Sequence, residues 1–287
     1  MNGEPEYAQE FVEVAGGRLG VQIYPEPTGV TDAPVAVIWP AMGVRARYYR
    51  PFAAELRAGG LAVVVADLRG NGASTPTPSR ADRYGYADLA DDVGAVLSAL
   101  KPRLDGRTRL LVGHSLGGQA ALLHLALHGG DDVDALALIA VGIPYWRSYP
   151  GLRGLGVLPY TQGIAATTAL LGVWPGWGFG GRQARGVIRD WAQTARTGRF
   201  PRLNGTDTEA AVRAVRTPVL AVSVDDDQFT PHETMDALCA KLAAAPLTRE
   251  RYTSAQAGAA LDHFTWVRAS TPLARRIAGF VGDLPSR

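Results

Sequence analysis

The sequence of 287 residues is poor in cysteine and lysine. Cys239 is its one cysteine, and arginine supplies nearly all the positive charge beside two lysines, Lys101 and Lys241. A single cysteine excludes a disulfide within the chain and permits an intracellular location. The net charge is only +2, and the basic residues are scattered. We therefore expect no nucleic-acid partner, because such proteins concentrate their basic residues in a patch.

The sequence also contains no apolar stretch long enough for a membrane span and no pattern typical of a secretory signal. The most apolar long stretch, 163–173, is too short to span a bilayer, and Pro175 closes it. The opening residues, MNGEPE, are acidic and lack the basic-then-apolar order of a secretory signal. We expect a soluble, cytoplasmic protein without a membrane span.

Short apolar runs rich in valine and isoleucine alternate with helical patterns along the chain. Because these runs are continuous rather than alternating, they predict strands covered on both faces, hence a mainly parallel sheet with helices on both sides. An antiparallel hairpin is expected over 11–14 and 18–24, and a helix over 86–100. The apolar runs are 35–39, 61–66, 109–113, 135–140 and 218–224.

A further helix is expected to begin at Pro231. Thr230 fits the N-cap position and Glu233 completes a capping box. Cys239 then falls on the buried stripe of this helix, where an apolar setting raises the pKa of a thiol, so we expect a core residue and not a nucleophile. The expected stripe is Met235, Leu238, Cys239 and Leu242.

Residues 143–213 break the alternation of strands and helices. They contain no buried-strand run but many aromatic residues among prolines and glycines, and a structureless loop of that length is improbable in a compact domain. We expect a helical cap insertion over 143–213, with the core formed by 1–142 and 214–287. Either the cap supplies an apolar pocket wall, with Tyr145, Trp146, Trp174 and Trp177 binding substrate, or it covers the sheet without touching substrate.

The segment Gly113-His-Ser-Leu-Gly-Gly118 lies between a buried run and a helical pattern. It fits G-x-S-x-G, a sharp strand-to-helix turn that exposes a serine hydroxyl above a sheet. Side chains at the two glycine positions flanking the serine would collide across such a turn. The context therefore predicts Ser115 as a nucleophile.

A serine nucleophile needs a base, and the base needs an orienting acid, in the chain order Ser, acid, His. Asp225, Asp226 and Asp227 follow the run that ends at 224, and His263 is the one histidine in a strand-end loop after them. We predict Asp227 as the acid, with Asp226 as the alternative, and His263 as the base. Asp225 is expected to be the solvated end of the strand.

An oxyanion needs two backbone N–H donors. One is expected from Leu116, directly after the serine, and the other from Met42 in the loop Pro40–Gly43 that follows the first buried run. Losing one such donor typically costs about 10²–10³ in turnover.

No metal or cofactor is expected. His124 and His128 have the spacing of metal ligands, but Leu-Ala-Leu lies between them where a zinc protease carries a glutamate, so they are expected on a helix surface. Neither a G-x-x-x-x-G-K-[ST] phosphate loop nor a G-x-G-x-x-G fingerprint follows the early strands.

These motifs resemble the α/β-hydrolase superfamily over essentially the whole chain. The resemblance is carried by the turn at 113–118, by Asp67-Leu-Arg-Gly-Asn-Gly-Ala-Ser74, by Thr217-Pro-Val-Leu and by His263-Phe264. It implies an α/β-hydrolase fold, a Ser115–Asp227–His263 triad and a cap after the sixth strand of the core. Many members carry His-Gly where this chain has Pro40-Ala41, so the pocket near the oxyanion loop is expected to differ in shape.

The resemblance implies a serine hydrolase of carboxylic esters or related small acyl compounds, of the carboxylesterase type (EC 3.1.1). Two alternatives stay open. The same three side chains suit an acyltransferase or cyclase if the cap excludes water, and the fold also hosts non-catalytic ligand-binding proteins. Arg45 and Arg47 stand where an anionic end of a substrate would pass, although exposed arginines are commonly solvated.

Overall fold

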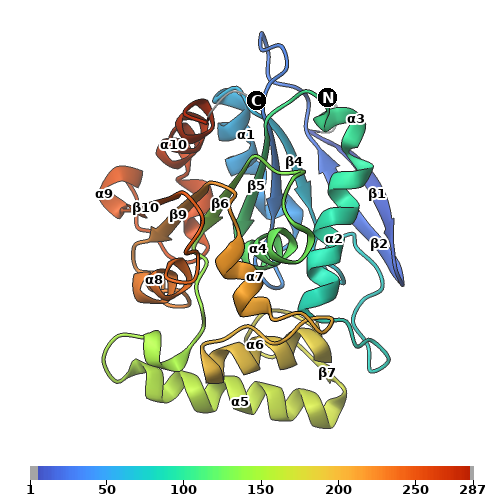
Figure 1. The fold of residues 1–287 in the computed structure, drawn as a ribbon, viewed down its shortest axis with the longest axis vertical. Coiled ribbons are helices and arrows are strands. Elements are labelled where there is room, and N and C mark those ends of the chain that lie inside the picture. Colours follow the sequence, from blue (N-terminus) through green and yellow to red (C-terminus); the bar gives the residue numbers. More distant parts are fainter. Residues whose placement is uncertain (1–5, 285–287) are drawn as a thin grey trace, which may run out of the picture.

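The computed structural model describes residues 6–284, which surround an eight-stranded sheet (Figure 1). The strands lie side by side in the order β1-β2-β4-β3-β5-β6-β9-β10. Their bounds are β1 Ala8–Val14, β2 Gly17–Ile23, β3 Val35–Trp39, β4 Ala62–Ala66, β5 Arg109–His114, β6 Ala135–Ile139, β9 Val219–Val224 and β10 Leu247–Tyr252.

The sheet is parallel from β4 through β10. The antiparallel pairs of this sheet are the β1–β2 hairpin and the pair of β2 with β4. Strands β3, β4, β6 and β9 are buried along their whole length. Burial on both faces explains why their sequences are continuous apolar runs. The predicted mostly parallel α/β fold is confirmed.

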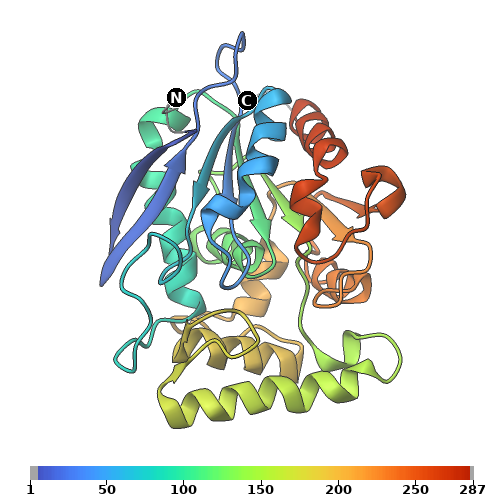
Figure 2. The ribbon, with the colours of Figure 1, turned by 180° about the vertical axis from the view of Figure 1, so that it is seen from behind.

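Helices cover both faces of the sheet (Figures 1 and 2). On one face, α2 (Tyr86–Ala99), α4 (Leu116–His128) and α8 (His232–Cys239) bury their apolar sides in one core. On the other face, α1 (Arg50–Ala58) packs against α10 (Thr271–Gly282). Shorter elements are η1 (Ala46–Tyr49), α3 (Lys101–Leu104), α9 (Ser254–Ala257) and η3 (Thr265–Arg268).

Helix α8 begins one residue later than the sequence pattern predicts. Pro231 is its N-cap residue, and no side chain caps it. The predicted capping box is therefore wrong, because the Thr230 hydroxyl donates to the carboxylate of Asp227 and not to the first turn of the helix. The buried stripe is confirmed for Met235 and Leu238, and burial raises the pKa of the Cys239 thiol to about 11.

The chain between β6 and β9 lies beyond the carboxyl ends of the parallel strands (Figure 1). It contains η2 (Trp146–Ser148), α5 (Arg153–Leu171), the two-stranded sheet of β7 (Val173–Trp174) and β8 (Gln183–Ala184), and α6 (Arg185–Thr197), which packs on α5. Helix α7 (Thr208–Ala214) instead packs on α4, among the helices of the core. No helix within residues 6–284 is long and apolar enough to cross a membrane.

Candidate active site

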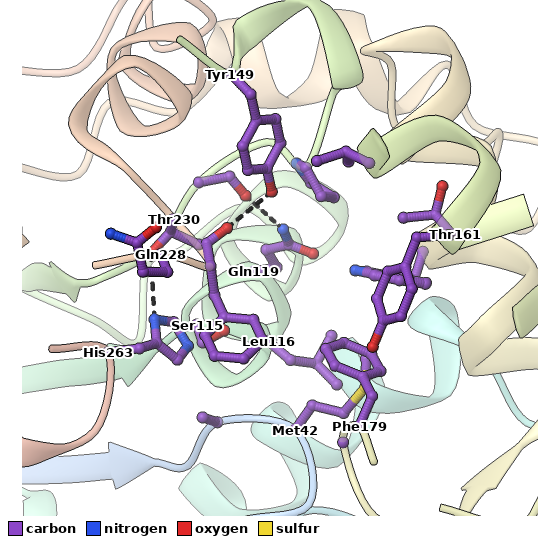
Figure 3. Close-up of a pocket in the computed structure, with 18 of the residues that line it drawn as sticks. Met42, Ser115, Leu116, Gln119, Tyr149, Thr161, Phe179, Gln228, Thr230 and His263 are labelled. Carbon is purple, nitrogen blue, oxygen red and sulfur yellow. Dashed lines mark hydrogen bonds between the residues drawn. The ribbon is translucent and has the colours of Figure 1, made fainter. Parts of the chain in front are cut away.

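Ser115 lies on the tight turn between β5 and α4 (Figure 3). Its backbone has φ = 51° and ψ = −121°, a strained conformation of the kind that clusters at functional sites. A Cβ on Gly113 would lie 2.2 Å from Gly118 Cα. One on Gly117 would lie 2.3 Å from the Trp39 carbonyl oxygen. The close approach of these backbones therefore requires both glycines of the motif.

His263 and Asp227 are joined by a short hydrogen bond. His263 Nδ1 lies 2.8 Å from Asp227 Oδ2, and both side chains are buried. Asp227 follows β9, and His263 lies in the loop between α9 and η3. A carboxylate on Nδ1 holds the ring in the tautomer whose Nε2 can accept a proton.

The neighbouring acids make other contacts. Asp226 is exposed and has φ = 54°. Asp225 pairs with Arg251 at 2.6 Å, so it is not simply a solvated strand end. Asp262, beside the histidine in sequence, accepts two backbone N–H groups of its own loop at 2.7 Å. Of the two acids that the sequence leaves as candidates, Asp227 is the one that contacts the imidazole.

Hydrogen bonds hold Asp227 in its ionised form. The backbone N–H groups of Phe229 and Thr230 donate to Oδ1 at 2.8 Å each, and the Thr230 hydroxyl donates to Oδ2 at 2.6 Å. Burial alone would raise the pKa of Asp227, but the bonds from His263 and Thr230 outweigh it and hold the pKa below its ordinary value. A charged carboxylate therefore faces the imidazole at neutral pH.

Ser115 and His263 line the same cavity (Figure 3). Within residues 6–284 the serine hydroxyl makes no hydrogen bond to the ring. In unliganded enzymes the bond between nucleophile and base is often long and tightens when substrate binds. The arrangement thus brings a hydroxyl, an imidazole and a carboxylate to one place from three separate segments of the chain.

The loop after β3 lies against the β5–α4 turn. The Ala41 N–H donates to the Tyr49 hydroxyl at 2.9 Å, and that oxygen lies 2.7 Å from His114 Nδ1. The Tyr49 oxygen therefore accepts from Ala41 and makes a second hydrogen bond with His114. This chain of bonds connects the two segments that carry Met42 and Leu116, both of which line the cavity.

His114 is a buried, uncharged neighbour of His263. Burial lowers the pKa of His114 well below its ordinary value, and the nearby His263 lowers it further. The two ring centroids are 4.8 Å apart. His114 therefore supports the His263 ring sterically and is not poised as a second base.

The cavity above Ser115 has a volume of about 380 Å³ and a mostly apolar lining. Two aromatic pairs shape it: Phe179 stacks on Trp191 with centroids 5.0 Å apart, and Phe229 contacts the His263 ring at 5.2 Å. The insertion contributes Tyr149, Tyr160, Phe179 and Trp191, and the core contributes Phe229 and Phe264.

The structure corrects the expected identity of the cavity wall. In the described part of the chain, Tyr145, Trp146, Trp174 and Trp177 are not among the lining residues. Trp177 is 65% exposed, and Trp174 is buried behind the wall, where its Nε1–H donates to the Phe179 carbonyl at 2.8 Å. Other aromatic residues of the same segment line the cavity, because the loop geometry decides which rings point inward.

Gln119 is a polar lining residue that the sequence interpretation missed. It lies on α4 one helical turn after Ser115 and is buried. The Tyr86 hydroxyl donates to its Oε1 at 2.8 Å. Its Nε2 points toward the cavity side of the helix (Figure 3) and donates to the Gly142 carbonyl at 2.7 Å. The four-residue spacing from Ser115, which places both on one helix face, was the signal available in the sequence.

Two known proteins are similar to parts of this chain in sequence. The chain is 37% identical over 101 residues to the AB hydrolase superfamily protein YisY of Bacillus subtilis, a match that spans 34% of each protein. It is 27% identical over 195 residues to a non-heme haloperoxidase of Rhodococcus erythropolis, covering 60% of this chain and 67% of that one. The chain thus matches about a third of the length of YisY.

Solved structures show the same fold at low sequence identity. The esterase RhEst1 from Rhodococcus sp. ECU1013 superposes with a TM-score of 0.61 at 18% identity, covering 98% of this chain and all of that one. Est1E from Butyrivibrio proteoclasticus, solved with ferulic acid bound, gives 0.63 at 19% identity, covering 93% of this chain and 97% of that one.

A family model described as serine aminopeptidase, S33, matches residues 33–256, well over half of the chain. The match includes the β5–α4 turn with Ser115 and the acid loop with Asp227. The chain therefore belongs to this hydrolase family, within the α/β-hydrolase superfamily.

Proposed function

We propose that this protein is a serine hydrolase that cleaves carboxylic esters or related acyl compounds through an acyl-enzyme on Ser115. One observation carries the proposal: Ser115 and His263 face a common apolar cavity, while the buried Asp227 binds the far side of the imidazole at 2.8 Å. Nucleophile, base and orienting acid are the three parts that serine-based acyl transfer needs.

The reaction follows from these positions. His263 Nε2 accepts the Ser115 proton while Oγ attacks the acyl carbon, and it returns that proton to the leaving oxygen as the carbon–oxygen bond breaks. Water, deprotonated by the same nitrogen, then releases the acid and restores the serine. The backbone N–H groups of Met42 and Leu116 are the proposed donors to the oxyanion.

The insertion over 143–213 is proposed as a cap that sets substrate size. Helix α5 and the β7–β8 loop contribute Tyr160 and Phe179 to the wall, so the cavity forms only where the insertion meets the strand ends. A small apolar cavity favours an apolar acyl group, and the name of one structural neighbour, the esterase RhEst1, points to ester bonds as the class that is cleaved.

The experiment that tests the proposal is labelling with a fluorophosphonate probe, read as the mass of the labelled peptide. We expect the label on Ser115 and none in Ser115→Ala. A panel of acyl esters of graded length, together with an aminoacyl p-nitroanilide, then identifies the bond that is cleaved. Folded protein that neither reacts with the probe nor turns over any ester would contradict the proposal.

Product analysis in the presence of a competing alcohol separates hydrolysis from acyl transfer. Hydrolysis yields free acid as the main product, because water reaches the acyl-enzyme. A dominant transesterified product would instead assign the same residues to an acyltransferase.

A further inference from the structure

The outer part of the insertion contains no charge. Residues 154–181 include no Asp, Glu, Lys or Arg, although 20% of the chain is charged. Helix α5 occupies most of this stretch and lies at the end of the molecule, away from the sheet (Figures 1 and 2). An uncharged stretch is typical of a buried segment, yet this one forms part of the surface.

The solvent-exposed side of α5 is apolar. Leu155 is 61% exposed and Leu170 is 88% exposed. The exposed positions 155, 159, 163, 166 and 170 recur at spacings of three and four and therefore share one helix face. Leu152, just before the helix, is 82% exposed. Single exposed leucines are ordinary, but a continuous apolar face marks a contact surface.

An arginine-lined groove runs beside this apolar face. The groove, of about 580 Å³, lies between α5 and α6; alanines of α5 form one wall, and Arg185, Arg189 and Arg196 of α6 form the other. Arg189 pairs with Asp190. Among the residues that the structure describes, Arg185 and Arg196 have no carboxylate partner. Uncompensated cations therefore flank the apolar stripe.

The positive charge of the chain is concentrated in the segment that contains α5 and α6. Residues 143–213 carry nine arginines against three acidic residues, a net charge of +6, whereas the rest of the chain carries −4. Of the three acids, Asp190 is buried and Glu209 pairs with Lys241 at 2.6 Å. The insertion is therefore complementary to a negatively charged surface, while the core is not.

We propose that the outer face of α5 docks on a lipid bilayer that contains anionic lipids. Helices that lie in the bilayer interface combine an apolar face with flanking arginines, and anionic headgroups attract such arginines. A second copy of this chain fits less well, because a two-fold contact would bring the same cationic rims together. The charge distribution thus selects the lipid surface.

Docking there would bring the lipid next to the candidate active site. Val157 and Tyr160 of α5 line the cavity, and Tyr160 is also 50% exposed. The inference goes beyond the proposed function, because binding to a bilayer does not require Ser115.

The test is flotation of the full chain, carrying Ser115→Ala, with vesicles of phosphatidylcholine alone or mixed with phosphatidylglycerol. We expect binding to the mixed vesicles, weakened about tenfold or more by the double substitution Leu155→Glu and Leu170→Glu. Leu247→Glu, on the edge strand β10 where the leucine is 38% exposed, is the matched control and should bind normally. The double substitution Arg185→Gln and Arg196→Gln should remove the preference for phosphatidylglycerol.

Three results would overturn the inference: no binding to either vesicle, binding that the α5 substitutions leave unchanged, or dimers in light scattering that the leucine substitutions dissociate. The last would assign the face to a second copy. Circular dichroism checks that the variants fold. As a second check, the same substitutions are made in the protein that keeps Ser115, and its turnover of a short water-soluble ester is measured. Failure of the proposed function appears separately, as absence of probe labelling.

Discussion

Thr230 and His263 share one carboxylate oxygen of Asp227. The Thr230 hydroxyl lies 2.6 Å from Asp227 Oδ2 and 3.0 Å from the Ala140 carbonyl, and His263 Nδ1 lies 2.8 Å from the same Oδ2. Thr230 therefore joins the acid loop after β9 to the end of β6. Its hydroxyl positions the acid instead of capping the helix that follows.

Replacing Thr230 with valine should weaken the proposed triad. Loss of a hydrogen bond to a charged group costs about 1.5–3 kcal/mol, so we expect kcat to fall about tenfold or more. Because this bond helps to hold the pKa of Asp227 low, the acid limb of the pH–rate profile should move to higher pH. Thr230→Ser keeps the hydroxyl and should retain the profile; an unchanged profile in the valine variant would contradict the assignment.

Amide substitutions should distinguish the two candidate acids. Asp227→Asn removes the charge that orients His263, and we expect ester turnover to fall by about 10³–10⁴. Asp226→Asn changes an exposed side chain and should leave turnover close to that of the parent. Steady-state kinetics on one short ester measure both, and comparable losses in the two variants would refute the role of Asp227.

Tyr49→Phe should destabilise the fold and loosen the oxyanion loop. The substitution leaves the Ala41 N–H and His114 Nδ1 without their buried partner, at about 1–3 kcal/mol for each unsatisfied group. Denaturant unfolding measures the loss. Tyr24→Phe is the control, because within residues 6–284 the hydroxyl of this buried tyrosine makes a single hydrogen bond, to Gln22 at 3.4 Å, and Tyr24 does not line the cavity. Equal stability losses in the two variants would show that the Tyr49 bonds contribute nothing specific.

His114 should make stability depend on pH in a defined window. The pKa of His114 in the folded state lies well below the ordinary 6.5. Below pH 6.5 the imidazole is therefore protonated in the unfolded chain while it is still neutral in the folded chain. The contribution of neutral His114 to the free energy of unfolding is complete above about pH 6.5 and is lost as the pH falls toward the pKa of the folded state. In His114→Gln, the free energy of unfolding should decline less steeply between about pH 7 and pH 5; an identical decline would exclude His114 as its source.

The corrected cavity wall makes a prediction about chain length. Val157→Phe fills part of the cavity, so kcat/KM should fall about tenfold for longer acyl esters while the value for an acetate ester changes little. Trp177→Ala removes a ring that is 65% exposed and should leave the chain-length profile unchanged. A profile altered by Trp177→Ala alone would restore the original expectation for that residue.

The elements of the core follow from local pattern. Continuous apolar runs, the G-x-S-x-G turn and the order of serine, aspartate and histidine were readable because each depends on neighbours in the sequence or on the known course of a parallel sheet. The sequence pattern did not distinguish exposed from buried residues on α4: His124 was expected at the surface but is only 3% exposed. An apolar helix with both sides covered carries no periodic signal to distinguish them.

The sequence by itself determined the fold class and the strand-to-helix turn that carries Ser115, and it predicted the candidates for the acid and the base. Only the tertiary structure decided that Asp227 contacts His263, that Thr230 supports the acid, and that Tyr160, Phe179 and Trp191 form the wall where other aromatics were expected. These contacts depend on how loops that are far apart in the sequence meet in the folded protein. Contacts between distant segments produce no periodic pattern in the sequence of either segment.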